Sequence, residues 1–498
     1  MKSRNMLMAI MGLLPTINGL IYAKQKPNIV FIFADDMTYN CMGNIGEDEL
    51  QTPNLDELRK NSMYFTHAFN QGGWHGAISV ASRSMLVTGQ YLWKAKALVE
   101  DKQKMRDVND SKPIFWGQYM KKAGYITYMT GKWHVAVDAS KVFDVVNHVR
   151  GGMPNQSDPG YAYSDKNPIG RKFIEGEEDD WKPYKKEYGG YWDGGKHWSE
   201  IVGDDAVAYI HEAQEKEEPF FMYLAFNAPH DPRQSPKRFV DMYPLDKINI
   251  PENFMPVYPY YRGIGCGEDL RDEWLAPFPR TEYSVKVNRQ EYYAIISHMD
   301  EQIGRILDAL KKSGKYDNTY IIFSADHGLA VGDHGLIGKQ NMYDASMRVP
   351  LMISGPGITK SVCDDLVYLQ DAMATSLDIA GSDYLDQIDF KSLLPVAKGN
   401  IKHKGISVEK SVYGAYMDLQ RMIRTEQYKL IIYPKIKIVR LYDLKNDPKE
   451  MTDLARLSSY KKVMDDLFQQ LLKKQKEVND PLNIEDAFIS FFAKIGGN

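Results

Sequence analysis

Cysteine is scarce in this sequence, and so is net charge. Only three of the 498 residues are cysteines, at positions 41, 266 and 363. An exported protein built on a disulfide framework usually carries a larger and even number, whereas three cysteines allow one pair at most. We therefore expect the fold to be held by a hydrophobic core, for which the hydrophobic content of 43% is sufficient.

The formal net charge is only −4. Proteins that bind nucleic acid usually carry a basic surface, so this balance gives no reason to expect a nucleic-acid partner. The length is the other bulk constraint. Domains usually contain roughly 100–200 residues and single α/β domains are often larger, so 498 residues fit one large domain with a smaller one beside it.

The N-terminal stretch lacks an apolar run of the roughly 20 residues that a membrane-spanning helix needs. Its apolar run, residues 6–14, follows Lys2 and Arg4 and precedes Ala23, a suitable cleavage position. This order is typical of a secretory signal peptide, here residues 1–23, and predicts a periplasmic or secreted protein. The alternative is a buried N-terminal helix. No cysteine follows the run, so we expect no lipid anchor and no stable membrane attachment.

Short, continuous apolar runs recur along the chain, and polar residues follow each of them. Runs of this length fit strands that are buried on both faces. Four such runs are residues 26–36, 124–134, 219–232 and 318–328. Because helical patterns alternate with them, we expect an α/β fold with a large, mainly parallel or mixed sheet flanked by helices.

The helix expected before the fourth run has one apolar stripe and ends near Gly314, as a C-cap glycine favours. The stripe consists of Ile295, Ile296, Met299, Ile303, Ile306, Leu307 and Leu310.

Two regions depart from this alternation. Residues 150–200 and 245–285 are rich in glycine, proline and aromatic residues, which indicates long functional loops rather than a separate domain. From about residue 385 the pattern changes to short antiparallel strands and a helix over 458–476. We therefore expect a catalytic domain over 24–384 and a smaller α+β subdomain over 385–498.

Titratable residues stand at the ends of the expected strands, where open α/β sheets bind their ligands. Asp35 and Asp36 follow the first run, and Asp326 and His327 follow the fourth. Adjacent carboxylates repel each other unless a positive charge lies between them, and a hard divalent cation with oxygen ligands fits best. A solvated turn is the alternative for one acidic pair alone.

Lys132 and His134 follow the second run, two residues apart, so in an extended chain they point the same way. A cation beside an imidazole suits an anionic substrate and proton transfer. His230 follows the third run. Lys339 is a further candidate cation, although its spacing alone fits a solvated lysine almost as well.

Ser79 and Arg83 are four residues apart, so on a helix they share one face. If Ser79 lies in the first turn, the helix amides and the guanidinium surround its hydroxyl with positive potential. The simpler interpretation is a helix cap worth about 1 kcal/mol.

Taken together, these residues resemble the type I sulfatases of the alkaline phosphatase superfamily. The family signature is Cys or Ser, any residue, Pro or Ala, Ser and Arg, followed by a stretch ending in Thr-Gly; here it reads SVASR at 79–83, followed by SMLVTG. GKWH at 131–134 matches a second family stretch. The strings NIVFIFADD, APHDP and SADHG…GDHG…GK also match in the family's order, so the resemblance covers nearly the whole mature chain.

The resemblance implies the alkaline phosphatase-like fold and conversion of Ser79 to Cα-formylglycine (3-oxoalanine) by a radical-SAM maturase before export. The hydrated aldehyde has two hydroxyls on one carbon: one attacks sulfur, and the other expels sulfate when it loses its proton. A serine sulfate ester has no such exit.

The resemblance also assigns roles residue by residue. It implies Ca²⁺ held by Asp35, Asp36, Ser79, Asp326 and His327. Further roles follow for five side chains: Arg83 and Lys132 stabilise formylglycine and sulfate, His134 holds or deprotonates the second hydroxyl, and His230 and Lys339 bind sulfate or protonate the leaving alcohol.

The substrate expected from this resemblance is a sulfated carbohydrate, a glycan or glycosaminoglycan. Arg233 and His197 are further candidates for substrate binding, and aromatic residues in loops 181–198 and 258–283 fit sugar stacking as well as ordinary packing. Two rivals stay open: a phosphoester or phosphonate hydrolase of the same superfamily that uses unmodified Ser79, and a non-catalytic protein that binds sulfated glycans.

Overall fold

The computed structural model describes most of the chain from residue 26 to residue 495. The described ranges are residues 26–43, 45, 49–152, 163–164, 167–168, 171–178, 181–186, 189–191, 195–399 and 409–495. The expected signal peptide over 1–23, with its cleavage position at Ala23, lies outside the described residues.

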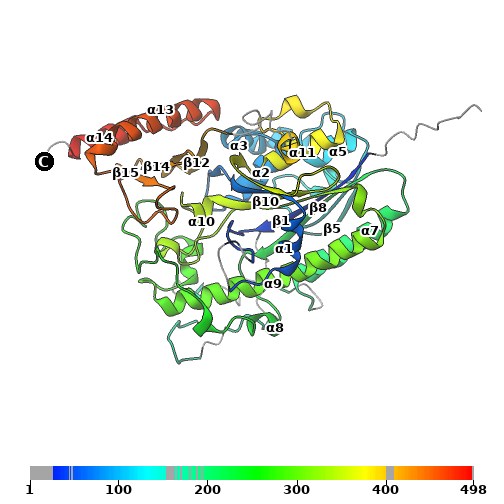
Figure 1. The fold of residues 1–498 in the computed structure, drawn as a ribbon, viewed down its shortest axis with the longest axis horizontal. Coiled ribbons are helices and arrows are strands. Elements are labelled where there is room, and N and C mark those ends of the chain that lie inside the picture. Colours follow the sequence, from blue (N-terminus) through cyan, green and yellow to red (C-terminus); the bar gives the residue numbers. More distant parts are fainter. Residues whose placement is uncertain are drawn as a thin grey trace, which may run out of the picture.

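The centre of the fold is an eight-stranded sheet that mixes parallel and antiparallel pairs (Figure 1). In spatial order its strands are β11 (Ser361–Tyr368), β2 (Met63–Phe69), β10 (Arg348–Ser354), β9 (Thr319–Ala325), β1 (Asn28–Asp35), β8 (Phe220–Pro229), β4 (Ile126–Lys132) and β5 (Val145–Arg150). β10 runs antiparallel to both of its neighbours, whereas the other pairs are parallel.

All four apolar runs singled out in the sequence form central strands of this sheet: β1, β4, β8 and β9. Every residue of β1 is buried. β1 lies between β8 and β9 and pairs in parallel with both, which explains why its sequence is a continuous apolar run rather than an alternating one. The expected α/β architecture is confirmed.

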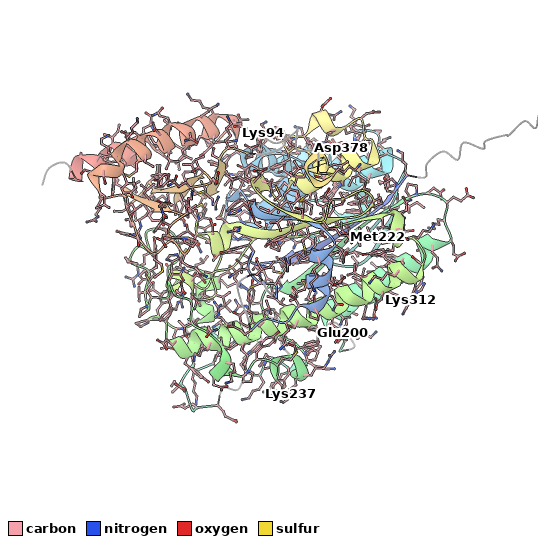
Figure 2. All side chains as sticks on the ribbon, in the orientation of Figure 1. Lys94, Glu200, Met222, Lys237, Lys312 and Asp378 are labelled. Atoms are coloured by element: carbon pink, nitrogen blue, oxygen red, sulfur yellow. The ribbon has the colours of Figure 1, made fainter. Side chains whose placement is uncertain are left out.

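Helices cover both faces of the sheet (Figure 1). One face carries α2 (Ile78–Thr88), α3 (Leu92–Glu100), α4 (Lys102–Arg106), α5 (Trp116–Lys122), α11 (Asp371–Ala380) and α12 (Leu394–Ala397). The other carries α1 (Pro53–Lys60), α7 (Trp198–Gln214) and α9 (Glu282–Lys312), with α8 (Lys237–Val240) packed outside α9. Figure 2 shows Met222 of β8 in the interior and Lys237 and Lys312 at the periphery.

α9 contains the apolar stripe seen in the sequence. All seven stripe residues are buried, and the helix ends at Lys312, two residues before Gly314, which has a φ of 71°. α9 packs against α7, α1 and β8, so the stripe fixes the helix across the sheet. None of the described helices is long and apolar enough to cross a membrane.

A second, five-stranded sheet occupies the C-terminal region. Its order is β15 (Ile438–Asp443), β14 (Tyr428–Tyr433), β13 (Gln420–Arg424), β12 (Val412–Tyr416) and β3 (Gly72–Gly73). α13 (Lys461–Glu477) and α14 (Glu485–Ile495) pack on it (Figure 1). The antiparallel strands and the helix expected here are confirmed, whereas the domain boundary at 385 stays a prediction.

The two sheets are joined close to the start of α2. β3 comes from the N-terminal half of the chain and pairs in parallel with β12. At Gly72 φ is +88°, and an added Cβ would lie 1.9 Å from the Ala415 carbonyl oxygen, so only glycine allows this close pairing. The remaining short elements are β6 (Tyr163–Ser164), β7 (Asn167–Pro168) and α10 (Asp344–Met347), with 3-10 turns at Ala139–Lys141, Leu245–Lys247, Arg271–Leu275, Tyr316–Asn318, Asp333–Gly335, Leu385–Gln387 and Ser458–Tyr460. The three cysteines form no disulfide.

Candidate functional site

The polar residues predicted at strand ends meet at the carboxyl edge of the central strands. Asp35 ends β1, Lys132 ends β4, and Asp326 follows β9 directly. Because β8 and β9 flank β1 in the same direction, the residues that follow them are brought to the same edge.

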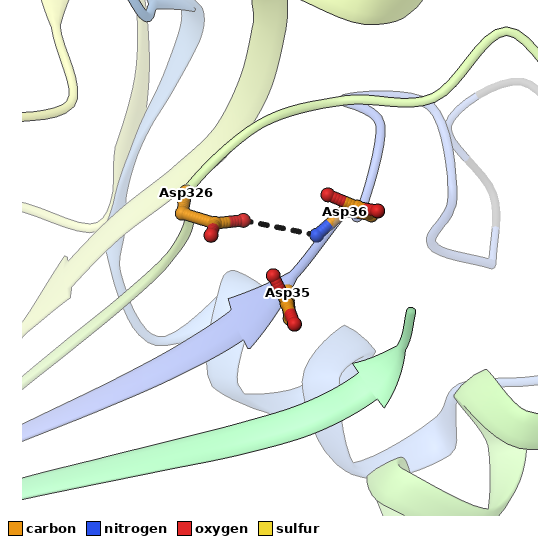
Figure 3. Close-up of side chains that lie close together, drawn as sticks. All are labelled: Asp35, Asp36 and Asp326. Carbon is orange, nitrogen blue, oxygen red and sulfur yellow. Dashed lines mark hydrogen bonds between the residues drawn. The ribbon is translucent and has the colours of Figure 1, made fainter. Parts of the chain in front are cut away.

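Three carboxylates converge there. Asp35, Asp36 and Asp326 are buried, and one oxygen from each lies within 4.8 Å of the others (Figure 3). The backbone N–H of Asp36 donates to Asp326 Oδ1 at 3.0 Å, shown dashed in Figure 3. Among the described residues this is the one group of three or more acidic, His or Cys side chains close enough to share a metal ion.

Three cations contact these acids from other parts of the chain. Arg83 Nε donates to Asp326 Oδ2 at 3.0 Å, and Arg83 Nη2 lies 3.5 Å from Asp35 Oδ1. Lys132 Nζ donates to Asp35 Oδ2, and Lys339 Nζ donates to both carboxylate oxygens of Asp36 at 2.6 Å. All three cationic side chains are buried. Their number equals that of the carboxylates, so the formal charges of the six side chains cancel.

Burial and mutual repulsion shape the acid–base properties of the carboxylates. Burial, reinforced by the neighbouring charge of Asp326, raises the pKa of Asp35 to about 6. Burial also raises the pKa of Asp36 well above its ordinary value, although Lys339 opposes this. For Asp326, burial is outweighed by Arg83 and Lys132, which hold its pKa below the ordinary range. Crowded carboxylates of this kind favour a bound cation.

Ser79 is not a helix cap. α2 begins at Ile78, its N-cap is Ala77, and no side chain caps the end. Ser79 lies in the first turn, only 2% exposed, and its hydroxyl donates to Asp35 Oδ1 at 3.2 Å. The capping interpretation was therefore wrong. The alternative, a hydroxyl held at the helix start against the carboxylates, agrees with this geometry.

Arg83 lies one helical turn later on the same face and ties α2 to two strands. In addition to its contact with Asp326, its Nη1 donates to the Lys132 carbonyl oxygen at 2.8 Å. The neighbouring Ser82 donates through Oγ to the Asp326 carbonyl oxygen at 2.6 Å. The serine–arginine pair thus fixes the start of α2 to the ends of β9 and β4.

The His327 ring is fully buried beside the carboxylates. Nδ1 lies 3.0 Å from the Gly328 carbonyl oxygen, whereas Nε2 has no hydrogen-bond partner. Burial lowers the pKa of His327 to about 4, so the ring is neutral. The three carboxylates fit a divalent cation, but no nitrogen of His327 belongs to the group of ligand atoms within 4.8 Å of one another, so its role as a further ligand stays a prediction.

His134 reaches the site by a route that the sequence did not predict. Its φ is +53°, so the segment after Lys132 is not extended and the argument from extended spacing was wrong. Nδ1 of His134 is buried without a hydrogen-bond partner. Burial, together with Lys132 and Arg83, lowers the pKa of His134 to about 2, so the ring is neutral.

The sharp turn at the end of β4 depends on Gly131. Its φ is +90°, and an added Cβ would lie 1.9 Å from the Ala225 carbonyl oxygen on β8. A side chain at this position would push β4 away from β8 and displace Lys132.

His230 approaches the same carboxylates from the end of β8. Nε2 lies 3.6 Å from Asp36 Oδ2, and Nδ1 lies 2.7 Å from the Asp231 carbonyl oxygen. Burial, together with Lys339 and Lys132, lowers the pKa of His230 well below its ordinary value. His230 and Lys339 therefore converge on Asp36.

His197 and Arg233, the further candidates for substrate binding, are both buried and hydrogen-bonded within the fold. His197 is the N-cap of α7: Nδ1 accepts from the Ser199 N–H at 3.0 Å, Nε2 lies 2.7 Å from the Gln234 carbonyl oxygen, and the residue is 2% exposed. Arg233 is 1% exposed and donates to Asn288 Oδ1 at 2.7 Å. Both side chains stabilise the segment that carries His230, and a substrate contact for either of them stays a prediction.

Several aromatic residues of the two loops are packed rather than presented to solvent. Trp181, Trp198 and Tyr258 are at most 3% exposed. Trp181 Nε1 donates to Glu291 Oε1 at 2.9 Å. For these three residues the packing interpretation is correct, and sugar stacking is not.

Residues that sequence reasoning missed also hold the site. The Tyr292 hydroxyl donates to the Asp36 carbonyl oxygen at 2.6 Å and accepts from the Thr38 N–H at 3.1 Å. This fixes Asp36, whose φ is 69°. Tyr292 lies on α9 beside the apolar stripe, and no pattern in the sequence distinguishes it from a core tyrosine.

Two family models match the chain. The one described as Sulfatase matches residues 27–382, and the one described as N-sulphoglucosamine sulphohydrolase, C-terminal, matches residues 332–477. The first covers more than half of the chain and contains every residue of the carboxylate cluster and the cations around it.

Relatives and a solved structure agree with this match. The chain is 28% identical to an arylsulfatase from Clostridium perfringens, with 90% of this chain and 94% of the relative covered. It is 26% identical to an N-acetylglucosamine-6-O-sulfatase from Bacteroides thetaiotaomicron, with 92% and 87% covered. A structure determined in complex with its substrate D-glucosamine-2-N,6-O-disulfate aligns with a TM-score of 0.69 at 23% identity, covering 92% of this chain and 99% of that one.

Proposed function

This chain belongs to the sulfatase family of alkaline phosphatase-like fold, and from that premise we propose that it hydrolyses a sulfate ester on a carbohydrate, a sulfated glycan or glycosaminoglycan. The observation that carries the proposal is the convergence of Ser79, three carboxylates and three buried cations at one edge of the sheet. The glycan-acting relative supports the class of substrate.

The charges of the site suit an anionic ester. Asp35, Asp36 and Asp326 are matched in number by Arg83, Lys132 and Lys339. A divalent cation held by the carboxylates and His327 would make the site positive overall, which attracts a sulfate ester and stabilises charge that develops in the transition state. We propose Ca²⁺ because it accepts several carboxylate oxygens in flexible geometry.

Ser79 is proposed as the residue that becomes formylglycine, with a radical-SAM maturase as partner before export. The hydrated aldehyde would supply two hydroxyls on one carbon, one to attack sulfur and one to release sulfate. The start of α2 places the side chain at position 79 against Asp35. Arg83 and Lys132 are both ion-paired with Asp35, where they can hold the position-79 side chain and the sulfate oxygens.

The protons are assigned to four side chains. As the attacking hydroxyl oxygen bonds to sulfur, it gives its proton to Asp35, the carboxylate that the position-79 hydroxyl contacts. The bond between sulfur and the ester oxygen breaks, and the ester oxygen leaves with the electron pair and takes a proton from one of the donors named next. His230 and Lys339 converge on Asp36 and are the proposed donors. His134, whose Nδ1 has no partner, is proposed to accept the proton of the second hydroxyl, so that sulfate leaves and the aldehyde returns.

The test compares Ser79→Ala with Ser84→Ala, a control in the same helix whose hydroxyl has no hydrogen-bond partner. Each protein is produced with a radical-SAM maturase. Mass spectrometry of the wild type should show a loss of two hydrogens at Ser79, and sulfate release from aryl sulfates and sulfated sugars should be lost in Ser79→Ala alone. Equal sulfatase activity in Ser79→Ala and the wild type would contradict the proposal.

The same preparations separate the rival activities. A phosphoester or phosphonate hydrolase would cleave aryl phosphate or phosphonate in preference to aryl sulfate, without modification of Ser79. A non-catalytic protein would bind sulfated glycans and release no sulfate. A periplasmic or secreted location, which rests on the N-terminal pattern, is tested by sequencing the N-terminus of the exported protein.

A further inference from the structure

A chain of ion pairs and hydrogen bonds connects the segment of His230 with the segment of Lys339. It begins at Asp231, whose Oδ1 lies 3.2 Å from His230 Nδ1. Arg271, in the 3-10 turn Arg271–Leu275, donates through Nη2 to Asp231 Oδ2 and through Nη1 to Asp272 Oδ1 at 2.5 Å.

The chain continues from Asp272 to the segment that carries Lys339. Gln340 Nε2 donates to Asp272 Oδ2 at 2.7 Å and to the Gly76 carbonyl oxygen at 2.9 Å. Gln340 Oε1 accepts from the Lys339 N–H at 3.0 Å. The Arg271 guanidinium thus bridges two acids, of which one adjoins His230 and the other leads to Lys339.

The next residue of the turn strengthens this attachment. Glu273 is fully buried and accepts from the N–H groups of Ile337 and Gly338, the latter at 2.9 Å. The turn is therefore docked on the backbone just before Lys339 as well as on the side chain just after it.

Exposure distinguishes Arg271 from the cations of the cluster. Its side chain is 32% exposed, whereas the Asp231 and Asp272 side chains are 4% and 12% exposed. Removing the guanidinium would leave two poorly solvated carboxylates facing each other, which would push the two segments apart. The planar fork of arginine can bridge two carboxylates in a way that the single ammonium of lysine cannot.

We propose that Arg271 and Asp272 are positioning residues that set the separation of His230 and Lys339, so that both side chains point at the ester oxygen that leaves. This inference rests on the proposed function, because it assumes that His230 and Lys339 protonate that oxygen. The same geometry gives Arg271 no direct part in the attack on sulfur, so its removal should weaken leaving-group protonation selectively.

The experiment measures kcat and KM for a series of aryl sulfates with leaving phenols of graded acidity, using the formylglycine-containing enzyme. Arg271→Gln is compared with Arg271→Lys and Asp272→Asn. Arg262→Gln is the control, because Arg262 is in the same loop region, 72% exposed, and paired with Glu268. Thermal unfolding of each variant confirms that the proteins compared are folded.

The expected result is a loss of kcat that grows as the leaving phenol becomes less acidic. For Arg271→Gln we expect on the order of 10- to 100-fold for phenyl sulfate and less than about threefold for nitrophenyl sulfate, since general acids matter most for poor leaving groups. Asp272→Asn should show the same trend, Arg271→Lys should restore part of the loss, and Arg262→Gln should follow the wild type.

Three results would overturn the inference: no loss in Arg271→Gln, an equal loss for every leaving group, or a rise in KM confined to substrates with a second anionic group, which would make Arg271 a substrate-binding residue. If the folded variants Arg271→Gln and Asp272→Asn disagree in trend, the bridge is also refuted. Failure of the proposed function would be visible separately, as absence of sulfate release by the wild type from every substrate, and would overturn both.

Discussion

Two regions of this molecule bury several charges, and they do so in opposite ways. The carboxylate cluster (Asp35, Asp36 and Asp326, with Arg83, Lys132 and Lys339) gathers its acids within 4.8 Å of one another. The Lys429 cluster, formed by Lys429, Asp344, Glu450 and Arg424, separates its acids with cations. Lys429 Nζ lies 2.6 Å from both Asp344 Oδ1 and Glu450 Oε1.

Both clusters contain a buried guanidinium nitrogen without a hydrogen-bond partner, Arg424 Nε in one and Arg83 Nη2 in the other. In the Lys429 cluster, Lys429 Nζ also donates to the Met342 carbonyl oxygen at 3.1 Å, and Glu450 Oε2 accepts from the Asp344 N–H at 2.7 Å. Near the carboxylate cluster, His327 Nε2 and His134 Nδ1 are buried without partners. Buried charge alone therefore does not indicate a function. Three carboxylates gathered at one place do, because a fold has no structural reason to assemble like charges.

The largest effect should come from Asp326→Asn. This change removes one oxygen ligand of the proposed metal site and also the acceptor of the Arg83 Nε hydrogen bond. We therefore expect kcat/KM to fall on the order of 10³-fold. Steady-state sulfate release measures it. Asp465→Asn is the control, because Asp465 forms an exposed ion pair with Lys461 within one helix. Retention of activity within a few-fold would show that the gathered carboxylates are not the site.

Lys429→Met should destabilise the fold without removing catalysis. It leaves Asp344 and Glu450 buried without their shared ammonium, and breaking a buried pair costs about 3–5 kcal/mol. Denaturant unfolding measures the loss, and the folded fraction should keep its turnover. Lys435→Met is the control. Lys435 and Asp418 form an ion pair in which both side chains are about half exposed, so its loss should change the free energy of unfolding by less than about 1 kcal/mol. A selective loss of turnover in folded Lys429→Met would erase the distinction between the clusters.

Calcium should stabilise the protein through one cluster only. At 100 times the dissociation constant, a ligand that binds only the folded state adds about 2.7 kcal/mol. We expect the unfolding temperature to rise with Ca²⁺ and to fall again with a chelator, in the wild type and in Lys429→Met alike. Asp326→Asn should lose this response. A response of equal size in Asp326→Asn would place the ion elsewhere.

The smallest effect is a pH dependence in the Lys429 cluster. Burial and the charge of Asp344 raise the pKa of Glu450 to about 7, whereas an unfolded glutamate titrates near 4.3. The folded state holds a proton that the unfolded chain releases, so this stability contribution is present at acidic pH and is lost as pH rises toward about 7.

The variant Glu450→Gln isolates this contribution, because a neutral side chain cannot titrate. As pH rises between the unfolded and the folded pKa of Glu450, the free energy of unfolding of the wild type should fall by at most ~1.4 kcal/mol per pH unit relative to the variant. Urea unfolding at pH 5 and pH 7.5 measures the difference. Parallel pH profiles for the two proteins would argue that Glu450 is ionised throughout.

Much of the fold followed from local patterns. The run ending in Asp35 became β1, and the stripe from Ile295 to Leu310 became the buried face of α9. Both are regular elements in which burial and sequence period agree, so apolar spacing alone identifies them. The antiparallel insertion of β10 between β2 and β9 was not foreseen, because its pairing is decided by partners far away in the chain.

The site was predictable to the extent that its residues stand in recognisable strings. Ser79, Arg83 and Lys132 were all identified before their contacts were known. Asp272 and Gln340 were not, since each is an ordinary polar residue until the 3-10 turn brings them together. The sequence also did not reveal that both ring nitrogens of His197 make hydrogen bonds within the fold, because their partners depend on how α7 packs.

By itself, the sequence determined which residues bear chemistry and on which strand ends they stand, because covalent order places Asp35 after β1 and Asp326 after β9. Only the tertiary structure decided how those groups are charged and oriented. Burial depends on everything that surrounds a side chain. The contact between Lys339 Nζ and the Asp36 carboxylate joins two residues that are 303 positions apart in the chain, so it too depends on the whole fold. Electrostatic energy depends on that distance and on the exclusion of water, neither of which the order of residues specifies.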